Sequence, residues 1–150
     1  MKIALGADHR GFGAKNGILN FLREQGHEVV DFGTDSSKSC DYPDAALPAS
    51  TAVRDGQCEL GILFCGSGIG MSIAANKVHG IRAALCHDEL TTEMARRHNN
   101  ANVLCLPADL AGEALIRRIV DVWLKTPYEG GRHDRRIEKI AEIENKQCGR

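Results

Sequence analysis

Residues 60–77 read LGILFCGSGIGMSIAANK, and this stretch decides the fold. Its first part is an apolar run too short for a buried helix, and it ends in the thiol of Cys65. Three alternating glycines follow, Gly66, Gly68 and Gly70, and after them apolar residues recur at helical spacing. The pattern predicts a buried strand, a tight glycine loop and the start of a helix.

The glycine loop after Cys65 is expected to present backbone N–H groups at a helix start. Such donors form an anion site and favour the thiolate of a nearby cysteine, so Cys65 is the candidate reactive group. The alternative is that Cys65 is a small packing residue and the glycines form only a turn. The loop has neither the spacing of the dinucleotide fingerprint nor the Gly-Lys-Ser/Thr ending of a P-loop.

The composition favours one domain over residues 1–150. With 43% hydrophobic residues the chain can build one core and is short for two. Lys plus Arg (19) nearly balance Asp plus Glu (20), so no basic field indicates nucleic acid. No long apolar segment indicates a membrane span or a secretion signal. The expectation is a soluble, cytoplasmic protein without nucleic-acid or membrane partners.

The six cysteines indicate thiols in a reducing compartment. They form no CxxC pair and no Cys/His spacing typical of zinc, so no metal is expected. Cys65, Cys86 and Cys105 each lie at or near the end of an apolar run, which suits partly buried, reduced thiols. Two of these three are expected to be packing residues.

Short apolar runs alternate with segments of helical periodicity along the whole chain. Strands are expected at residues 1–7, 27–33, 59–64, 80–86 and 102–106, and helices at 12–25, 43–55, 88–98 and 110–125. An interior proline removes a hydrogen bond, so the second helix is expected to become regular only near Pro48. The alternation predicts an α/β fold, a three-layer sandwich around a five-stranded, parallel, Rossmann-like sheet.

Ligands of such sheets bind beyond the carboxyl ends of the strands. This rule gathers Asp8 and His9, the loop 65–70 and residues 86–88 at one edge of the sheet.

Residues 128–137 read YEGGRHDRRI and are expected to form a hinge before a last helix. Arg132 and Arg136 lie one turn apart, a spacing with which two guanidinium groups can converge on one phosphate. The alternative is a solvated basic turn. The last helix carries a narrow apolar strip that can pack on its own sheet or on a neighbouring subunit: Ile137, Ile140, Ala141 and Ile143.

A series of motifs runs in a fixed order along nearly the whole chain: Asp8-His9, Asp41-Tyr42-Pro43, residues 65–70, 74–77 and 80–83, His98-Asn99, Asn102-Val103 and residues 129–133. Together they resemble the type B ribose-5-phosphate isomerases. The wider family includes subunits of galactose-6-phosphate isomerase and isomerases of other aldose phosphates. The resemblance therefore fixes the reaction better than the sugar.

The resemblance implies interconversion of D-ribose 5-phosphate and D-ribulose 5-phosphate through a cis-enediol, with no metal and no cofactor. Cys65 matches the family's proton-abstracting base, and Ser67 matches a position that hydrogen-bonds the base or the reacting oxygens. His98 matches the acid/base that opens the furanose ring, with Asp8 assisting. Imidazole suits that task because its free pKa lies near neutral pH. Without the other motifs, His98 would be interpreted as a helix-capping or surface histidine.

The resemblance also implies the substrate contacts. Tyr42 and Asn99 match sugar-hydroxyl contacts, the loop positions Gly66, Gly68, Ile69 and Gly70 would hold the developing negative charge, and His9, Arg132 and Arg136 match phosphate-binding positions. In this family the active site lies between subunits, so His98, Asn99 and both arginines are expected to come from the neighbour of the chain that supplies Cys65. A homodimer or a tetramer follows, with the C-terminal helix packing on the partner subunit.

One position departs from the family pattern. Many relatives place a phosphate-contacting arginine after the fifth strand, where this chain has Pro107-Ala108-Asp109. An aspartate that pointed inward would repel the phosphate. Either Asp109 turns away and caps the following helix, or the substrate is held differently.

Two other functions remain open at the level of sequence. One is isomerisation of another aldose phosphate, with four or six carbons, such as galactose 6-phosphate or allose 6-phosphate. The other is a non-catalytic, flavodoxin-like phosphate-binding module, which predicts an ordinary Cys65 thiol. An isomerase instead predicts a thiolate population that is lost when a sugar-phosphate analogue binds, and inactivation by mild oxidation.

Overall fold

Five parallel strands form a single sheet in the computed structural model, which describes residues 1–148. The strands are β1 (Lys2–Ala7), β2 (Glu28–Asp31), β3 (Leu60–Cys65), β4 (Ala83–Leu85) and β5 (Val103–Pro107). Their spatial order is β2-β1-β3-β5-β4. The predicted α/β fold with a five-stranded parallel sheet is confirmed. β2 and β4 are shorter than predicted; both lie at an edge of the sheet, where a strand bonds to one neighbour only.

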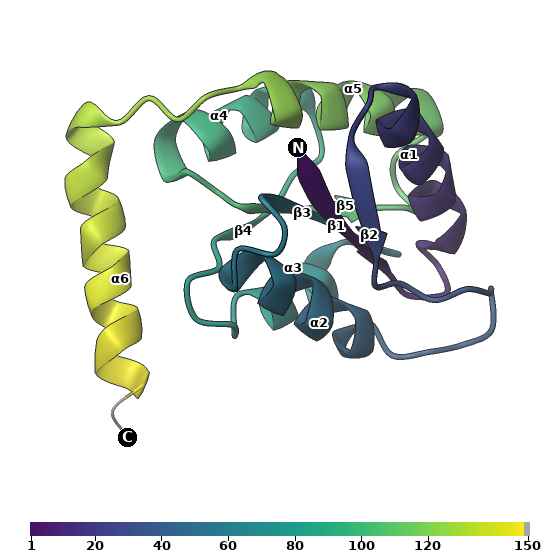
Figure 1. The fold of residues 1–150 in the computed structure, drawn as a ribbon, viewed down its shortest axis with the longest axis horizontal. Coiled ribbons are helices and arrows are strands. Elements are labelled where there is room, and N and C mark those ends of the chain that lie inside the picture. Colours follow the sequence, from purple (N-terminus) through teal and green to yellow (C-terminus); the bar gives the residue numbers. More distant parts are fainter. Residues whose placement is uncertain (149–150) are drawn as a thin grey trace.

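Helices cover both faces of the sheet (Figure 1). They are α1 (Phe12–Glu24), α2 (Pro43–Arg54), α3 (Ile69–Ala75), α4 (Glu89–Asn99) and α5 (Glu113–Lys125). Helices α1, α4 and α5 pack on one face, and α2 and α3 pack on the other. No helix within residues 1–148 is long and apolar enough to cross a membrane.

The central strand β3 is buried along its whole length. Successive side chains of a strand point to opposite faces, so Ile62 and Phe64 pack under α1 and α5 while Leu63 and Cys65 face α2 and α3. Burial on both faces explains why the strand reads as a continuous apolar run. Cys65 thus ends the strand with its side chain on the α2 and α3 side.

Helix α2 begins at Pro43, so the expectation that it becomes regular only near Pro48 is wrong. Proline fits the first turn of a helix, where the N–H has no intrahelical partner. Pro48 does remove one hydrogen bond from the interior. The helix continues because Ala46, Ala49 and Ala52 are buried against the sheet, and this packing fixes the backbone on both sides of Pro48.

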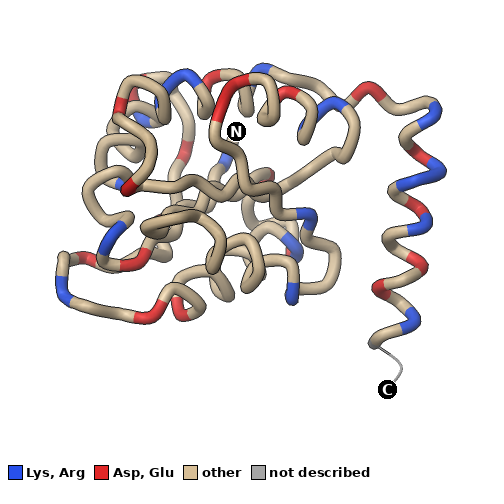
Figure 2. Tube along the Cα trace, turned by 180° about the vertical axis from the view of Figure 1, so that it is seen from behind, with Lys and Arg blue, Asp and Glu red and all other residues tan. Residues whose placement is uncertain are grey.

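A short 3₁₀ turn, η1 (Gly131–His133), leads into the last helix, α6 (Asp134–Cys148). Helix α6 leaves the layers and stands beside the β4 edge of the sheet (Figure 1). Charges of both signs alternate along it (Figure 2). The side chains of Ile140 and Ile143 are 46% and 60% exposed, so the apolar strip predicted on α6 is largely uncovered within one chain.

Candidate active site

The segments after β1 and β3 meet at the carboxyl edge of the sheet. Ala7 pairs with Phe64 in the register of the two strands, and the Asp8 N–H donates to the Phe64 carbonyl (3.2 Å). Asp8 and His9 therefore begin where Cys65 and its loop begin. Residues 86–88 follow β4, on the far side of β5 from this point.

The sulfur of Cys65 accepts a hydrogen bond from the loop. The Gly68 N–H donates to Cys65 Sγ at 3.1 Å, and Cys65 is only 5% exposed. Gly68 has a φ of +74°, and a Cβ atom on it would lie 2.5 Å from Leu85 Cδ1. Only glycine fits both this backbone conformation and this close approach. The Ser67 hydroxyl accepts from the Ile69 N–H (3.3 Å), which orders the next turn of the loop.

The two other cysteines singled out in the apolar runs are also buried; Cys86 follows β4, and Cys105 lies within β5. Cys86 and Cys105 are 2% and 0% exposed. Burial raises the pKa of both thiols, that of Cys105 well above its usual value. They are neutral packing residues, as predicted for two of the three strand-end cysteines.

Asp8 and His9 are held by local contacts. Asp8 is buried, and its Oδ1 accepts from the N–H groups of Arg10 (2.9 Å) and Gly11 (3.0 Å), which closes the turn into α1. His9 Nδ1 lies 3.1 Å from the Cys40 carbonyl and 3.3 Å from the Cys40 amide nitrogen. This anchoring leaves Nε2 as the ring nitrogen available to a ligand.

Tyr42 lies against the glycine loop from the start of α2. A Cβ atom on Gly70 would lie 2.8 Å from Tyr42 Cζ, so the aromatic ring covers this glycine. Tyr42 is 39% exposed, so the ring forms part of the site wall and still faces solvent.

Asp109 does not cap α5, and that alternative is wrong. The N-cap of α5 is Gly112, and no side chain accepts a hydrogen bond there. Asp109 Oδ2 instead accepts from Arg10 Nε at 2.5 Å, beside Gly66. The opposite charge of Arg10, three residues after Ala7, attracts the carboxylate away from the helix.

His98 and Asn99 lie at the opposite edge of the sheet from Cys65. Helix α4 starts after the carboxyl end of β4, with Asp88 as its N-cap, and His98 and Asn99 are in its last turn. Eleven residues of helix span about 16 Å, close to the length of β3. One chain therefore does not bring His98 or Asn99 to Cys65.

A cluster of His98, Glu129 and His133 forms at this amino edge. The two imidazole rings stack at 4.4 Å between centroids, with 12° between their planes. Glu129 carboxylate oxygens lie 4.0 Å from each Nε2, and Arg97 bonds Glu129 Oε2 at 2.9 Å. Arg97 lowers the pKa of Glu129, so this carboxylate is ionised.

The sequence predicted for His133 only a supporting position behind the residues that contact the substrate. His133 is 5% exposed, and its Nε2 has no hydrogen-bond partner among residues 1–148. Burial, followed by the electrostatic effect of neighbouring His98, lowers the pKa of His133. A neutral His133 therefore stacks on the imidazole of His98. The four-residue spacing of Glu129 and His133 was the available sequence signal.

The same cluster is the one group of three within residues 1–148 whose donor atoms lie close enough to suggest a metal ion. These atoms lie within 4.8 Å of one another. Zinc binds nitrogen and oxygen donors at about 2.0–2.2 Å along converging directions. Two ligands of a tetrahedral zinc lie about 3.4 Å apart. The Glu129 oxygens lie 4.0 Å from each Nε2, so the cluster is wider than a zinc site.

Arg132 and Arg136 belong to the tail, on the side of His98. Arg132 lies in η1 and Arg136 in the first turn of α6, and both are exposed. They stand away from the glycine loop of their own chain, as His98 does.

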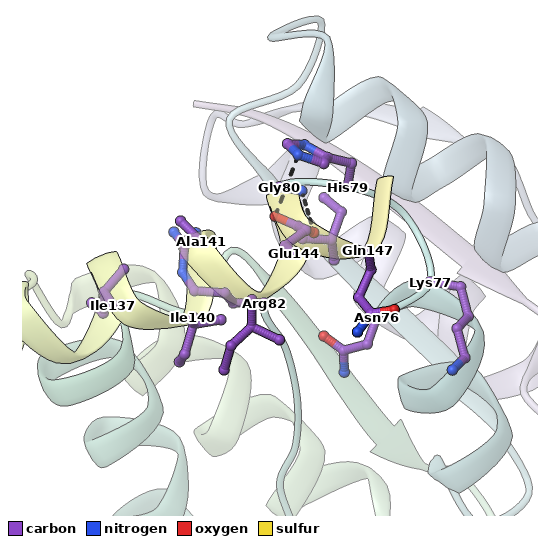
Figure 3. A pocket seen from close by; sticks show the side chains of 12 residues that line it. Asn76, Lys77, His79, Gly80, Arg82, Ile137, Ile140, Ala141, Glu144 and Gln147 are labelled. Carbon is purple, nitrogen blue, oxygen red and sulfur yellow. Dashed lines mark hydrogen bonds and ion pairs between the residues drawn. The ribbon is translucent and has the colours of Figure 1, made fainter. Parts of the chain in front are cut away.

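A groove of about 440 Å³ separates α6 from the segment 76–82 (Figure 3). It is bridged by Glu144, whose Oε1 accepts from the Gly80 N–H (2.8 Å) and whose Oε2 lies 3.8 Å from His79 Nε2. This α6 groove does not include Cys65 or the glycine loop.

Comparison with known proteins gives consistent matches along the whole chain. The family model described as ribose/galactose isomerase matches residues 3–140. Ribose-5-phosphate isomerase B of Escherichia coli is 47% identical over 97% of this chain and 98% of its own. D-erythrulose-4-phosphate isomerase of Pectobacterium atrosepticum is 42% identical over 98% of this chain and 97% of its own. The solved structure of ribose-5-phosphate isomerase B from Clostridium thermocellum is 50% identical, with a TM-score of 0.97 over 98% of this chain and 99% of that one.

Proposed function

The chain belongs to the ribose/galactose isomerase family, and on this premise we propose that it interconverts D-ribose 5-phosphate and D-ribulose 5-phosphate. As an aldose–ketose isomerase it moves one proton between C1 and C2 of an open-chain sugar phosphate. The reaction needs ring opening, a base at the carbon next to the carbonyl, donors for the enediolate oxygen and cations for the phosphate. Each requirement has candidate residues in this chain.

Cys65 is the proposed base. The observation that carries this assignment is the hydrogen bond from the Gly68 N–H to Cys65 Sγ (3.1 Å), which fixes the sulfur at the end of β3 against the glycine loop. The thiolate takes the proton from C2 and returns it to C1 through a cis-enediol, while the proton of the O2 hydroxyl passes to O1. The amides of residues 66–70 can stabilise the negative charge on the carbonyl oxygen, by about 3 kcal/mol for a well-aimed donor. Ser67 hydrogen-bonds the reacting oxygens.

His98 of the partner subunit is the proposed acid/base for ring opening. An imidazole accepts the proton of the anomeric hydroxyl and returns one to the ring oxygen near neutral pH. Asp8, beside Cys65 and buried, assists this proton transfer. Asn99 of the partner subunit and Tyr42 contact the sugar hydroxyls, and His9 with the partner's Arg132 and Arg136 bind the phosphate.

A site shared between two copies of the chain follows from the positions of these groups. Cys65 and His98 lie at opposite edges of the sheet within one chain, so a second copy has to supply one of them. Apolar side chains are exposed next to the glycine loop, on the α2 and α3 surface, and on α6: Leu47 (59%), Ile69 (52%), Ile73 (55%), Ile140 (46%) and Ile143 (60%). Covering them in a homodimer, itself able to pair into a tetramer, would remove this surface from water and seat α6 on the partner.

We propose ribose 5-phosphate as the sugar with the highest kcat/KM, and the relatives name the sugars to compare with it. A relative that is 42% identical is named for a four-carbon sugar phosphate, and the family description includes galactose. The same base and loop can serve aldose phosphates of four to six carbons, since the proton transfer involves only C1 and C2. Screening ribose 5-phosphate against four- and six-carbon aldose phosphates, galactose 6-phosphate and allose 6-phosphate included, ranks them by kcat/KM.

The decisive experiment measures ribulose 5-phosphate formation from ribose 5-phosphate with a chelator present. Cys65→Ala is expected to lower kcat by roughly 10²- to 10⁴-fold, the usual contribution of a positioned acid–base group. The matched control is Cys58→Ala, which removes a buried thiol two residues before β3 begins and should retain activity. Turnover by Cys65→Ala equal to the parent's would exclude Cys65 as the base, and a folded parent without turnover would exclude ribose 5-phosphate.

A further inference from the structure

The side chain of Arg10 has no role in the site described above, although it extends over the glycine loop. Its backbone N–H is fixed to Asp8 Oδ1 (2.9 Å), directly beyond the end of β1. A Cβ atom on Gly66 would lie 3.0 Å from Arg10 Nε and 3.1 Å from Arg10 Cδ. A guanidinium group therefore lies directly against the residue that follows Cys65.

Asp109 holds this guanidinium in place from the end of β5. Its Oδ2 accepts from Arg10 Nε at 2.5 Å. The Asp109 N–H donates to the Gly66 carbonyl (3.0 Å), and the Ala108 N–H donates to the Cys65 carbonyl (2.9 Å). Because backbone bonds tie the carboxylate to the same loop, the ion pair has a defined position relative to Cys65.

The pair leaves most of the guanidinium free. A guanidinium has five N–H donors, and Asp109 occupies the one on Nε. Within the described chain no acceptor bonds the two terminal nitrogens, and the Arg10 side chain is 58% exposed. A planar edge with two nitrogens matches two oxygens of a phosphate. The arrangement offers a fixed, charged, bidentate site for an oxyanion one residue from His9.

We propose that Arg10, positioned by Asp109, binds the phosphate group of the substrate. The inference rests on the proposed function, since it takes a sugar phosphate as the ligand of the glycine-loop site. It also explains how an aspartate can lie beside an anion site. The carboxylate is neutralised through Nε, while the terminal edge of the same guanidinium faces the ligand. The competing interpretation is a closed ion pair that only joins the β1 and β5 loops.

The test is calorimetric titration with inorganic phosphate at constant ionic strength, together with KM and kcat for ribose 5-phosphate. Arg10→Ala is expected to raise the phosphate Kd and the KM about tenfold or more, the usual effect of losing a hydrogen bond to a charged group. The change in kcat should be much smaller, because the phosphate lies away from C1 and C2. Arg10→Lys, which keeps the charge and loses the planar edge, should recover part of the affinity.

The matched control is Arg54→Ala. Arg54 forms a similarly exposed pair with Asp55 (Nε to Oδ1, 2.7 Å) at the far end of α2, and its loss should leave the phosphate Kd unchanged. Asp109→Asn tests the positioning role. It should weaken phosphate binding when Arg10 is present and have no effect in the Arg10→Ala background, because Asp109 acts through Arg10. Tighter phosphate binding by Asp109→Asn would show that Asp109 only repels the ligand.

An unchanged phosphate Kd in Arg10→Ala would overturn the proposal and support the closed ion pair. The proposed function fails separately. If the parent does not convert ribose 5-phosphate but Arg10→Ala still weakens phosphate binding, the sugar assignment is wrong and the anion site stands. If the parent is active and Arg10→Ala binds phosphate as the parent does, the role of Arg10 alone is wrong.

Discussion

At the carboxyl edge of the sheet backbone hydrogen bonds hold the glycine loop, whereas at the amino edge the Glu129 N–H donates to the Arg97 carbonyl (3.0 Å) and His98 meets the tail through its side chain. The Asp8 N–H donates to the Phe64 carbonyl just before the loop (3.2 Å), and the Asp109 N–H donates to the Gly66 carbonyl within it (3.0 Å). Within the His98 cluster the contacts of the imidazole are a ring stack with His133 and a Glu129 oxygen at 4.0 Å. The proposed base is thus built into one chain, while the proposed acid has a looser setting and needs a second chain to reach it.

The largest effect on activity is expected when Cys65 and His98 are substituted in different chains of one dimer. His98→Asn and Cys65→Ala homomers should each lose activity by roughly 10²-fold or more. Heterodimers that carry one variant in each chain, purified through two different tags, should regain about half of the parent's activity. One of their two sites combines an intact Cys65 with an intact His98. Inactive heterodimers would show that each site belongs to a single chain.

The next largest effect is expected on the free energy of unfolding, from a substitution in the glycine loop. Gly68→Ala places a Cβ atom 2.5 Å from Leu85 Cδ1 and 3.0 Å from the Leu106 carbonyl carbon, at a φ of +74°. We expect it to destabilise the fold by about 2–4 kcal/mol, measured by denaturant unfolding. It should also displace the N–H that bonds Cys65. The control is Gly13→Ala, where nothing lies within 4 Å and the helix should gain stability. Equal stability of the two variants would contradict the close packing of the loop.

The smallest effect is a pH dependence at the amino edge. The pKa of His133 is lowered in the folded chain, so the unfolded chain takes up its proton first as the pH falls. The stability linked to neutral His133 is therefore complete above the unfolded pKa of about 6.5 and is lost as the pH falls through the lower folded pKa. Between pH 7 and pH 5 the Tm of His133→Gln should fall less than the Tm of the parent. Parallel curves would assign the acid sensitivity to other groups.

The sequence predicted most of the carboxyl edge because that edge is local. Residues 60–77 contain the strand, Cys65, the glycines and the helix start in continuous order. The rule for parallel sheets places Asp8 and His9 beside the glycine loop. Individual side-chain contacts between segments distant in sequence were not predicted. The partner of Asp109 lies 99 residues away, so the expectation of a helix cap rested on the nearer segment and was wrong.

The amino edge was predicted less completely for the same reason. His98 was found through the family resemblance, whereas its contact with His133 depends on how the tail crosses the end of α4. The start of the regular helix near Pro48 was wrongly predicted because the sequence shows the lost hydrogen bond. It does not show how the surrounding alanines pack against the sheet. Local rules located each element, and tertiary contacts decided its bounds.

Lys15 gives the carboxyl edge a chemical reporter. It is 2% exposed, and its Nζ bonds Asp31 Oδ2 (2.6 Å) and the Thr34 carbonyl (2.8 Å), under the segment that leads to Tyr42. An amine-reactive label can reach this nitrogen only when residues 32–41 lift away from α1. The rate at which Lys15 is acylated in the native protein therefore measures how often the wall of the site opens.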